Sequence, residues 1–228
     1  MKETRKVCTL NTCMLCKQGL KEWLPAIEGN KKNIAVKKGE LVFSEGAEAK
    51  GIYFVYEGLI KVHKKWDEEK DLIVRFAKKG DILGHRGMGS NLFYSVSATA
   101  LENSVLCFLE HDFFVTSLKI NTDFCYHLLL FFADELKESE HRMRNLAHMS
   151  VKGRLAEGLI HLHNKFGTDE KGNINITLSR QDLAAYIGTT YETAFRMLTE
   201  LVNDGILQVD GKQIRIINEL ALKNVQTL

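Results

Sequence analysis

After His111 the chain contains no glycine or proline until Gly153, and this interval constrains the fold more than any other feature. Both residue types break helices, so their absence favours one long helix. Asn121-Thr122-Asp123 offers the short polar side chains that cap a helix start. The 228-residue chain is also long enough for two domains. We therefore predict a long helix with a separate folded part on each side of it.

Apolar and small residues recur along this predicted helix at alternating steps of four and three, which is the spacing of a coiled-coil seam. The seam positions are Cys125, Leu129, Phe132, Leu136, Ser139, Met143 and Leu146. They predict a homodimer, whose interface is expected to contain Leu129, Phe132, Leu136, Met143 and Leu146. Cys125 is expected to be a core residue.

The alternative is a helix packed on its own domain. Additional apolar residues indicate that its first half contacts that domain as well; these are Leu128, Leu130 and Phe131.

The residues before the helix have the pattern of an all-β domain. From Asn33 to about Glu110, short apolar runs alternate with Gly-bearing turns at the spacing of an antiparallel sandwich or barrel. The predicted strands are 40–43, 51–56, 59–63, 71–76 and 104–109. The predicted turns contain Gly39, Gly46, Gly58 and Gly80.

The residues after the helix have a different pattern. A further helix is predicted from Val151, followed by a polar loop at 167–173 and then by two short helices. A hairpin comes next, in which Asp210-Gly211 joins strands at 206–209 and 213–217. An Asp-Gly pair between alternating apolar residues is a strong hairpin signal.

Residues 178–201 have the pattern of a helix-turn-helix. Ser179 can cap the first helix, with Asp182 three residues on, and Gly188 permits a tight turn before a second helix that starts near Thr190. The helices are expected to bury Leu183, Ala184, Ile187, Ala194, Met197, Leu198 and Leu201. The outward residues, near the end of the second helix that would meet base edges, are Tyr191, Glu192, Phe195 and Arg196.

Glu192 and Arg196 are four residues apart on this second helix. A guanidinium can fork onto O6 and N7 of guanine, and a carboxylate can accept from the amino group of cytosine, so the two suit G·C pairs. The alternative is a solvated salt bridge within one helix. We favour base contact, because the two residues lie on the turn that must face DNA.

Composition excludes more than it identifies. The net charge of +2 is too small to indicate nucleic acid, so the DNA prediction depends on the motif. No apolar stretch approaches the roughly 18 residues of a membrane span, and no apolar signal core follows Met1, so we expect a cytoplasmic protein without membrane contact. No nucleophile elbow, phosphate loop, HExxH or paired-carboxylate motif occurs, which argues against an enzyme.

The order of these elements resembles that of the Crp/Fnr family of regulators, from about residue 34 to residue 217. The resemblance includes the segment Gly188-Thr189-Thr190-Tyr191-Glu192-Thr193-Ala194-Phe195-Arg196. The resemblance implies an α+β fold with an antiparallel β-barrel of the cyclic-nucleotide-binding jelly-roll type, a long dimerisation helix and a winged helix-turn-helix. The corresponding ranges are 1–29 for a Cys-bearing segment, 30–118 for the barrel, 119–149 for the helix and 150–228 for the DNA-binding domain.

The family resemblance also implies a homodimer that binds palindromic double-stranded DNA. Activation through RNA polymerase follows from the family by analogy. The residues expected to contact DNA are Arg180, Thr190, Tyr191, Glu192, Thr193, Phe195 and Arg196. Phe195 stands where the Fnr branch has Ser before the Arg, and Tyr191 where the Crp branch has Arg before the Glu. The resemblance therefore leaves the half-site sequence open.

The barrel resembles a cyclic-nucleotide-binding fold whose phosphate cassette is incomplete. The cassette needs a Glu soon after its Gly and an Arg-Ser or Arg-Thr pair, and here Tyr94 stands at the position of the arginine. The cyclic phosphate would lose its bidentate charged partner, although Arg86 could substitute. Cyclic AMP is therefore disfavoured. A regulator that responds to a cyclic nucleotide or another small ligand, or to none, is the alternative function.

Three of the five cysteines lie close together near the N-terminus. An odd number without an export signal fits metal or redox chemistry better than a disulfide framework. In the Fnr branch four cysteines hold an oxygen-sensing [4Fe-4S] cluster, and the matching positions are Cys8, Cys13, Cys16 and Cys107.

The spacing of the N-terminal cysteines, C-x4-C-x2-C, is closer to that of a plant-type ferredoxin, which leaves a [2Fe-2S] cluster or zinc open. With no cofactor, Cys107 would be a core residue and the other three would be exposed. A bound cluster would act as an effector that favours the DNA-competent dimer and makes the regulator oxygen- or redox-responsive.

Overall fold

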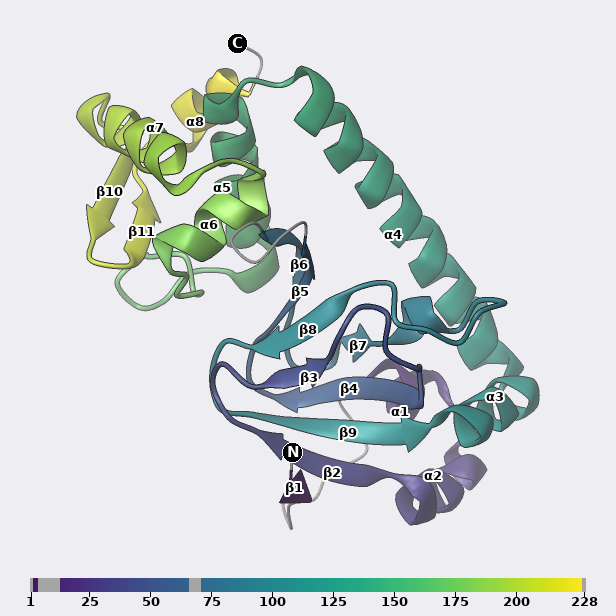
Figure 1. The fold of residues 1–228 in the computed structure, drawn as a ribbon. Helices are drawn as coiled ribbons and strands as arrows, with labels where there is room; N and C mark the ends of the chain where they lie inside the picture. Colours follow the sequence, from purple (N-terminus) through teal and green to yellow (C-terminus); the bar gives the residue numbers. More distant parts are fainter. Residues whose placement is uncertain (1, 4–12, 66–70, 227–228) are drawn as a thin grey trace. The chain divides into compact units, whose positions relative to one another are not determined.

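A computed structural model describes residues 2–3, 13–65 and 71–226 of the chain (Figure 1). Cys8 therefore lies outside the described residues. The chain divides into two compact units. The first comprises Met1–Trp66 and Val74–Glu135, and the second comprises Asp67–Ile73 and Leu136–Leu228.

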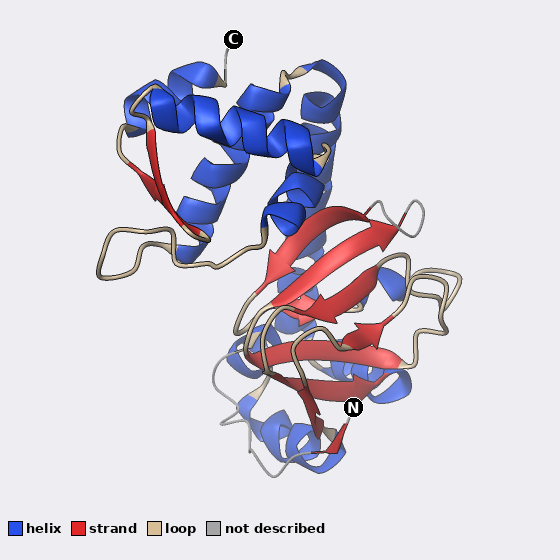
Figure 2. Cartoon of the chain, turned by 60° about the vertical axis from the view of Figure 1, so that its left-hand side comes forward, coloured by secondary structure: helices blue, strands red, loops and turns tan. Residues whose placement is uncertain are grey.

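Two β-sheets account for most of the first unit (Figure 2). One sheet has the strand order β1-β2-β9-β4-β7 and the other has the order β3-β8-β5-β6. The strands are β1 (Lys2–Glu3), β2 (Lys32–Val36), β3 (Leu41–Phe43), β4 (Gly51–Glu57), β5 (Ile60–Lys65), β6 (Asp71–Ala77), β7 (Ile82–Leu83), β8 (Ser97–Ala100) and β9 (Ser104–Glu110). Neighbours pair antiparallel, as in β2·β9, β4·β9 and β5·β8. All five strands predicted from the sequence are present.

The turn between β4 and β5 shows why the sequence needs glycine there. Gly58 has φ 101°, and a Cβ at this position would lie 2.1 Å from Oγ of Ser104. Any side chain would both strain the backbone and collide with β9, so this turn admits only glycine.

The five-stranded sheet has two buried faces, and alternation along each strand assigns side chains to them. On β9, Leu106 packs in the cluster between the two sheets, whereas Cys107 and Leu109 belong to a second cluster. On β4, Val55 belongs to the first cluster and Phe54 to the second. Cys107 therefore points away from the interior of the sandwich.

Helices supply the rest of the second cluster. They are α1 (Met14–Gln18), η1 (Lys21–Trp23), α2 (Leu24–Asn30), α3 (His111–Ile120) and the first half of α4 (Thr122–His148). A further short helix, η2 (His85–Gly87), follows β7. The sequence pattern did not predict the helices before β2, nor α3, which ends at Ile120 and is separated from α4 by Asn121 alone.

Helix α4 is the predicted long helix, and its start at Thr122 agrees with the predicted cap. Leu128 is buried and Phe131 packs against the second cluster, so the first half of α4 does contact its own domain. Two predictions for this helix were wrong. Leu130 is 44% exposed, and Cys125 is exposed rather than part of the core.

The second unit contains α5 (Val151–Phe166), α6 (Arg180–Ile187), α7 (Tyr191–Asn203), the hairpin β10 (Leu207–Asp210) with β11 (Gln213–Ile216), and α8 (Glu219–Val225). The order of α5, two short helices and a hairpin agrees with the sequence prediction, to which α8 is an addition. None of the helices within the described ranges is long and apolar enough to span a membrane.

Candidate functional site

Helices α6 and α7 form the predicted helix-turn-helix: α6 begins at the predicted cap Ser179, and α7 begins after Thr190, near its predicted start. Oγ of Ser179 accepts a 2.9 Å hydrogen bond from the N–H of Asp182, and Oγ1 of Thr190 accepts one of 3.3 Å from the N–H of Thr193. Between the helices, Gly188 has φ 68° and ψ 52°, a left-handed conformation that glycine adopts without strain. The local sequence therefore determines where both helices begin and how the first one ends.

The buried and exposed faces of these helices agree with the sequence prediction. The buried side chains are Leu183, Ala184, Ile187, Ala194, Leu198 and Leu201, while Met197 is half-buried. The outward residues Tyr191, Glu192, Phe195 and Arg196 are all exposed. Within the described part of the chain, neither Glu192 nor Arg196 makes an ion pair or a side-chain hydrogen bond. The alternative of a salt bridge between them is not realised here.

The other residues predicted to contact DNA have partners within the protein. Arg180 donates from Nη2 to the carbonyl of Gly211 in the β10–β11 turn, and so connects α6 to the hairpin. The hydroxyl of Thr190 also lies 3.1 Å from that of Thr193. The Arg180 contact therefore holds α6 to the hairpin, and the threonine contact belongs to the first turn of α7.

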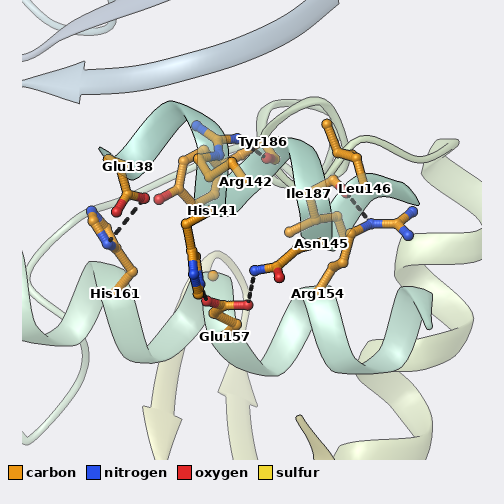
Figure 3. Close-up of a pocket in the computed structure, with 11 residues that line it drawn as sticks. Glu138, His141, Arg142, Asn145, Leu146, Arg154, Glu157, His161, Tyr186 and Ile187 are labelled. Atoms are coloured by element: carbon orange, nitrogen blue, oxygen red, sulfur yellow. Dashed lines mark hydrogen bonds and ion pairs between the residues drawn. The ribbon is translucent and has the colours of Figure 1, made fainter. Parts of the chain in front are cut away.

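Two arginines bind the carbonyl groups at the end of α6 (Figure 3). Arg142, on the second half of α4, donates from Nη2 to the carbonyls of Tyr186 at 2.7 Å and of Ile73 at 3.0 Å. Arg154, on α5, donates to the carbonyls of Ile187 at 2.9 Å and of Gly188 at 3.2 Å. Because the last carbonyls of a helix have no partner within the helix, these bonds fix the turn of the helix-turn-helix.

Side-chain packing strengthens this anchoring of the turn. The guanidinium of Arg142 lies 4.8 Å above the ring of Tyr186, and burial raises the pKa of Tyr186 to about 12. A Cβ on Gly188 would lie 2.5 Å from Cδ2 of Leu146, so this leucine packs directly over the turn. The role of these two arginines could not be predicted from the sequence, because single arginines in helices carry no periodic signal.

Figure 3 shows a second set of polar contacts between α4 and α5 in the same pocket, whose volume is about 100 Å³. Glu157 accepts hydrogen bonds from Nδ2 of Asn145 at 2.5 Å and from Nε2 of His141. Glu138 lies 3.9 Å from the ring of His161. These contacts hold the second half of α4 against α5.

The predicted dimer seam on α4 is mostly exposed in the single chain. The exposed fraction is 64% for Leu129, 60% for Leu136 and 65% for Met143. Leu146 is less exposed because it also covers the Gly188 turn, and Phe132 is partly buried against the second cluster. An exposed apolar stripe of this length on one helix is unusual for a monomer.

The described thiols predicted as cofactor ligands all belong to the second cluster of buried side chains. Sγ of Cys13 and Sγ of Cys16 lie 3.3 Å apart at the start of α1, and both side chains are buried. Cys107 belongs to the same cluster of side chains, because alternation along β9 turns it toward the helices. These three thiols are the soft donors that iron and zinc prefer. Within the described residues, however, no three His, Cys, Asp or Glu side chains are arranged so that they could hold a metal ion.

Two hydrogen bonds link the thiol segment to the start of α4. The N–H of Leu20, directly after α1, donates to Oδ1 of Asn121 at 2.6 Å, and Nε1 of Trp23 donates to Oγ of Ser117 at 3.0 Å. Asn121 is fully buried between α3 and α4. These bonds connect the segment after α1 to α3 and to the residue that precedes α4.

The position at which the phosphate cassette was expected to have its arginine belongs to the packed core of the barrel. Tyr94 is buried, donates from its hydroxyl to the carbonyl of Gly51 at 2.8 Å, and stacks on Phe43 with ring centroids 4.0 Å apart. Burial raises the pKa of Tyr94, so the hydroxyl stays neutral. Arg86, the possible substitute for the missing arginine, instead pairs with Glu135. The structure therefore has a neutral phenol at the position where the family resemblance places an arginine.

Two different families match separate parts of the chain. Residues 33–121 match the family described as the cyclic nucleotide-binding domain, and residues 153–225 match the Crp-like helix-turn-helix domain. The chain is 29% identical over 199 residues to the "Anaerobic regulatory protein" of Bacillus subtilis, which covers 86% of this chain and 82% of that protein. It is 29% identical over 191 residues to the "Fumarate and nitrate reduction regulatory protein" of Yersinia pestis, with 82% and 75% covered.

Solved structures show the same fold. FixK2 from Bradyrhizobium japonicum aligns with a TM-score of 0.76 at 24% identity, covering 86% of this chain and 96% of that one. A CooA mutant from Carboxydothermus hydrogenoformans aligns with a TM-score of 0.77 at 18% identity, covering 99% and 98%. The relatives named above are regulators rather than enzymes, in agreement with the lack of catalytic motifs in the sequence.

Proposed function

Because the chain belongs to the Crp/Fnr family of transcriptional regulators and carries its helix-turn-helix DNA-binding domain, we propose that it acts as a homodimer that binds a palindromic DNA site and activates transcription. The observation that carries this proposal is the exposed face of α7. Glu192 and Arg196 lie on a capped helix whose turn is anchored by Arg142 and Arg154. A base-reading helix needs both properties, since its side chains must be accessible and its position fixed.

Within this proposal Arg196 donates to guanine and Glu192 accepts from cytosine. Tyr191 and Phe195 flank them, and Arg180, Thr190 and Thr193 contact the sugar-phosphate backbone or the base edges nearby. The side chains of Glu192 and Arg196 support this assignment, because among the described residues neither has a partner to give up on binding. The protein would act in the cytoplasm, where the chromosome is, and would contact RNA polymerase when it activates.

The DNA-binding proposal is tested by selecting bound duplexes from a randomised palindromic pool and measuring affinities by fluorescence anisotropy at fixed salt. Loss of one good bidentate contact costs roughly 1–3 kcal/mol, so Arg196→Ala should weaken binding of the selected duplex at least about fivefold and relax selection at one G·C pair. Asn203→Ala, an exposed position at the far end of α7, is the matched control. Equal affinity of both variants for selected and scrambled duplexes would contradict the proposal.

We further propose that an iron-sulfur cluster held by Cys8, Cys13, Cys16 and Cys107 regulates the protein. The shared buried position of Cys13, Cys16 and Cys107 supports this proposal, as do relatives named for anaerobic regulation. When bound, such a cluster would supply a redox- and oxygen-sensitive group next to the fold of α1. The protein's own residues would carry the response, since Leu20 and Asn121 join α1 to the start of α4.

The cluster proposal is tested by purifying the protein without oxygen and measuring its absorbance, iron and acid-labile sulfide. Equal iron and sulfide would distinguish a cluster from zinc, and their ratio to protein would distinguish [4Fe-4S] from [2Fe-2S]. A colourless protein without iron would refute the cluster proposal. The protein would then be a regulator that responds to another ligand or to none.

A further inference from the structure

Two aromatic side chains lie side by side on the outward face of α7. Tyr191 and Phe195 are one helical turn apart, with ring planes 11° apart in angle and ring centroids 6.2 Å apart. They are 49% and 52% exposed. Half-exposed aromatic rings gain only part of the free energy that burial would give them. Their position therefore indicates a contact with another molecule.

The aromatic pair and the charged pair share one surface. Glu192 directly follows Tyr191 and Arg196 directly follows Phe195, so the two pairs form adjacent columns at the start of the helix. A ligand that meets Arg196 must also meet Phe195. Because this helix is the DNA-reading element of the family, the occupant of the surface is the major groove.

The chemistry of Phe195 restricts what it can recognise in that groove. A phenyl ring has no hydrogen-bonding group, and the only apolar group that base pairs present in the major groove is the C5-methyl of thymine. Stacking on Tyr191 reduces the freedom of the ring and so favours one contact position. We propose that Phe195, supported by Tyr191, selects a thymine next to the G·C pair contacted by Glu192 and Arg196. This inference rests on the DNA-binding function proposed above.

The test uses the full chain and the duplexes selected from the randomised palindromic pool. Each thymine of the half-site is replaced in turn by deoxyuridine, which removes the methyl group and keeps the hydrogen-bonding pattern. Burial of one methyl group corresponds to about a fourfold change in affinity, so one position per half-site should respond by about that factor. Replacement in both half-sites should weaken binding by about 10- to 20-fold.

Variants assign the methyl preference to the ring. Phe195→Ser should bind the thymine and deoxyuridine duplexes equally, whereas Phe195→Leu should keep part of the preference. Val202→Ser, which removes another exposed apolar side chain from α7, should leave the preference unchanged. Circular dichroism shows whether each variant keeps its helical content.

The outcomes separate this inference from the function on which it rests. The protein could bind its site specifically and yet bind thymine and deoxyuridine equally at every position. It could also keep its preference for thymine in Phe195→Ser. Either result would overturn the role of Phe195 and leave the DNA-binding proposal standing. If no duplex were enriched, both the DNA-binding proposal and this inference would be wrong.

Discussion

The carboxylate of Glu135 on α4 lies 2.8 Å from the guanidinium of Arg86. Nη1 of Arg75 is 3.8 Å and Nε2 of His85 is 3.7 Å from the same carboxylate. Burial alone would raise the pKa of Glu135, but the contacts with His85, Arg75 and Arg86 outweigh it and lower the pKa to about 2. Burial lowers the pKa of His85, so this ring is neutral near pH 7 and the two arginines are the charged partners.

The first prediction concerns acid stability. A carboxylate with a lowered pKa in the folded state stabilises the fold above its unfolded pKa, near 4.5, and this contribution is lost as the pH falls toward 2. A shift of this size corresponds to about 3 kcal/mol of unfolding free energy. In urea unfolding between pH 6 and pH 3, the unfolding free energy of the natural chain should fall more steeply with decreasing pH than that of Glu135→Gln. Glu140→Gln, an exposed position on the same helix, should follow the natural chain; equal slopes in all three would contradict the prediction.

The second prediction concerns the anchored turn of the helix-turn-helix. Arg142→Met removes two hydrogen bonds from a charged donor and leaves the carbonyls of Ile73 and Tyr186 without this partner. We expect a loss of about 2–3 kcal/mol in unfolding free energy and weaker DNA binding, because α6 and α7 lose their fixed position. Thermal unfolding and anisotropy measure the two effects.

Arg144→Met is the control for Arg142→Met, since Arg144 is exposed and its hydrogen bonds are with the nearby side chains of His141 and Asn145. Equal losses in both variants would show that the carbonyl contacts of Arg142 have no special role.

The third prediction concerns the exposed seam on α4. Leu136→Glu places a charge in the middle of the apolar stripe, where a dimer would have to bury it without a partner, so we expect predominantly monomeric protein and loss of DNA affinity. Analytical ultracentrifugation measures the dimer fraction. Leu220→Glu, on α8, changes an even more exposed leucine outside the seam and should leave the dimer intact. A dimeric Leu136→Glu would exclude the seam as the interface.

The helix-turn-helix could be predicted from sequence because its determinants are local. Ser179 and Thr190 cap helices that start one residue later, and Gly188 is within the same segment. Strands β3, β4, β5, β6 and β9 could be predicted for a similar reason, since alternation and turns are local patterns. Strand β8 escaped prediction because Ser97-Ala98-Thr99-Ala100 lacks the large β-formers that mark a strand.

The remaining features depend on contacts between distant residues. Asn121 binds the N–H of Leu20, and Arg86 binds Glu135, across separations that no sequence pattern records. The error at Cys125 has another cause. An apolar stripe predicts that a helix face is covered, but it does not distinguish the protein's own core from a second copy. The position of Cys107 in the same buried cluster as α1 depends on both the strand register and the helix packing.

The last prediction concerns the thiols. Cys107→Ser replaces a soft donor with a weakly coordinating hydroxyl and should lower the iron and sulfide content of protein purified without oxygen to a small fraction of that of the natural chain. Cys125→Ser is the matched control, because Cys125 is exposed on α4 and outside the proposed ligand set. Because Cys107 is buried, its replacement can also affect folding. The iron content is therefore expressed per folded dimer, and circular dichroism checks the fold of both variants. Full iron in Cys107→Ser would remove it from the ligand set. Loss of iron in Cys125→Ser instead would require a different set of four thiols.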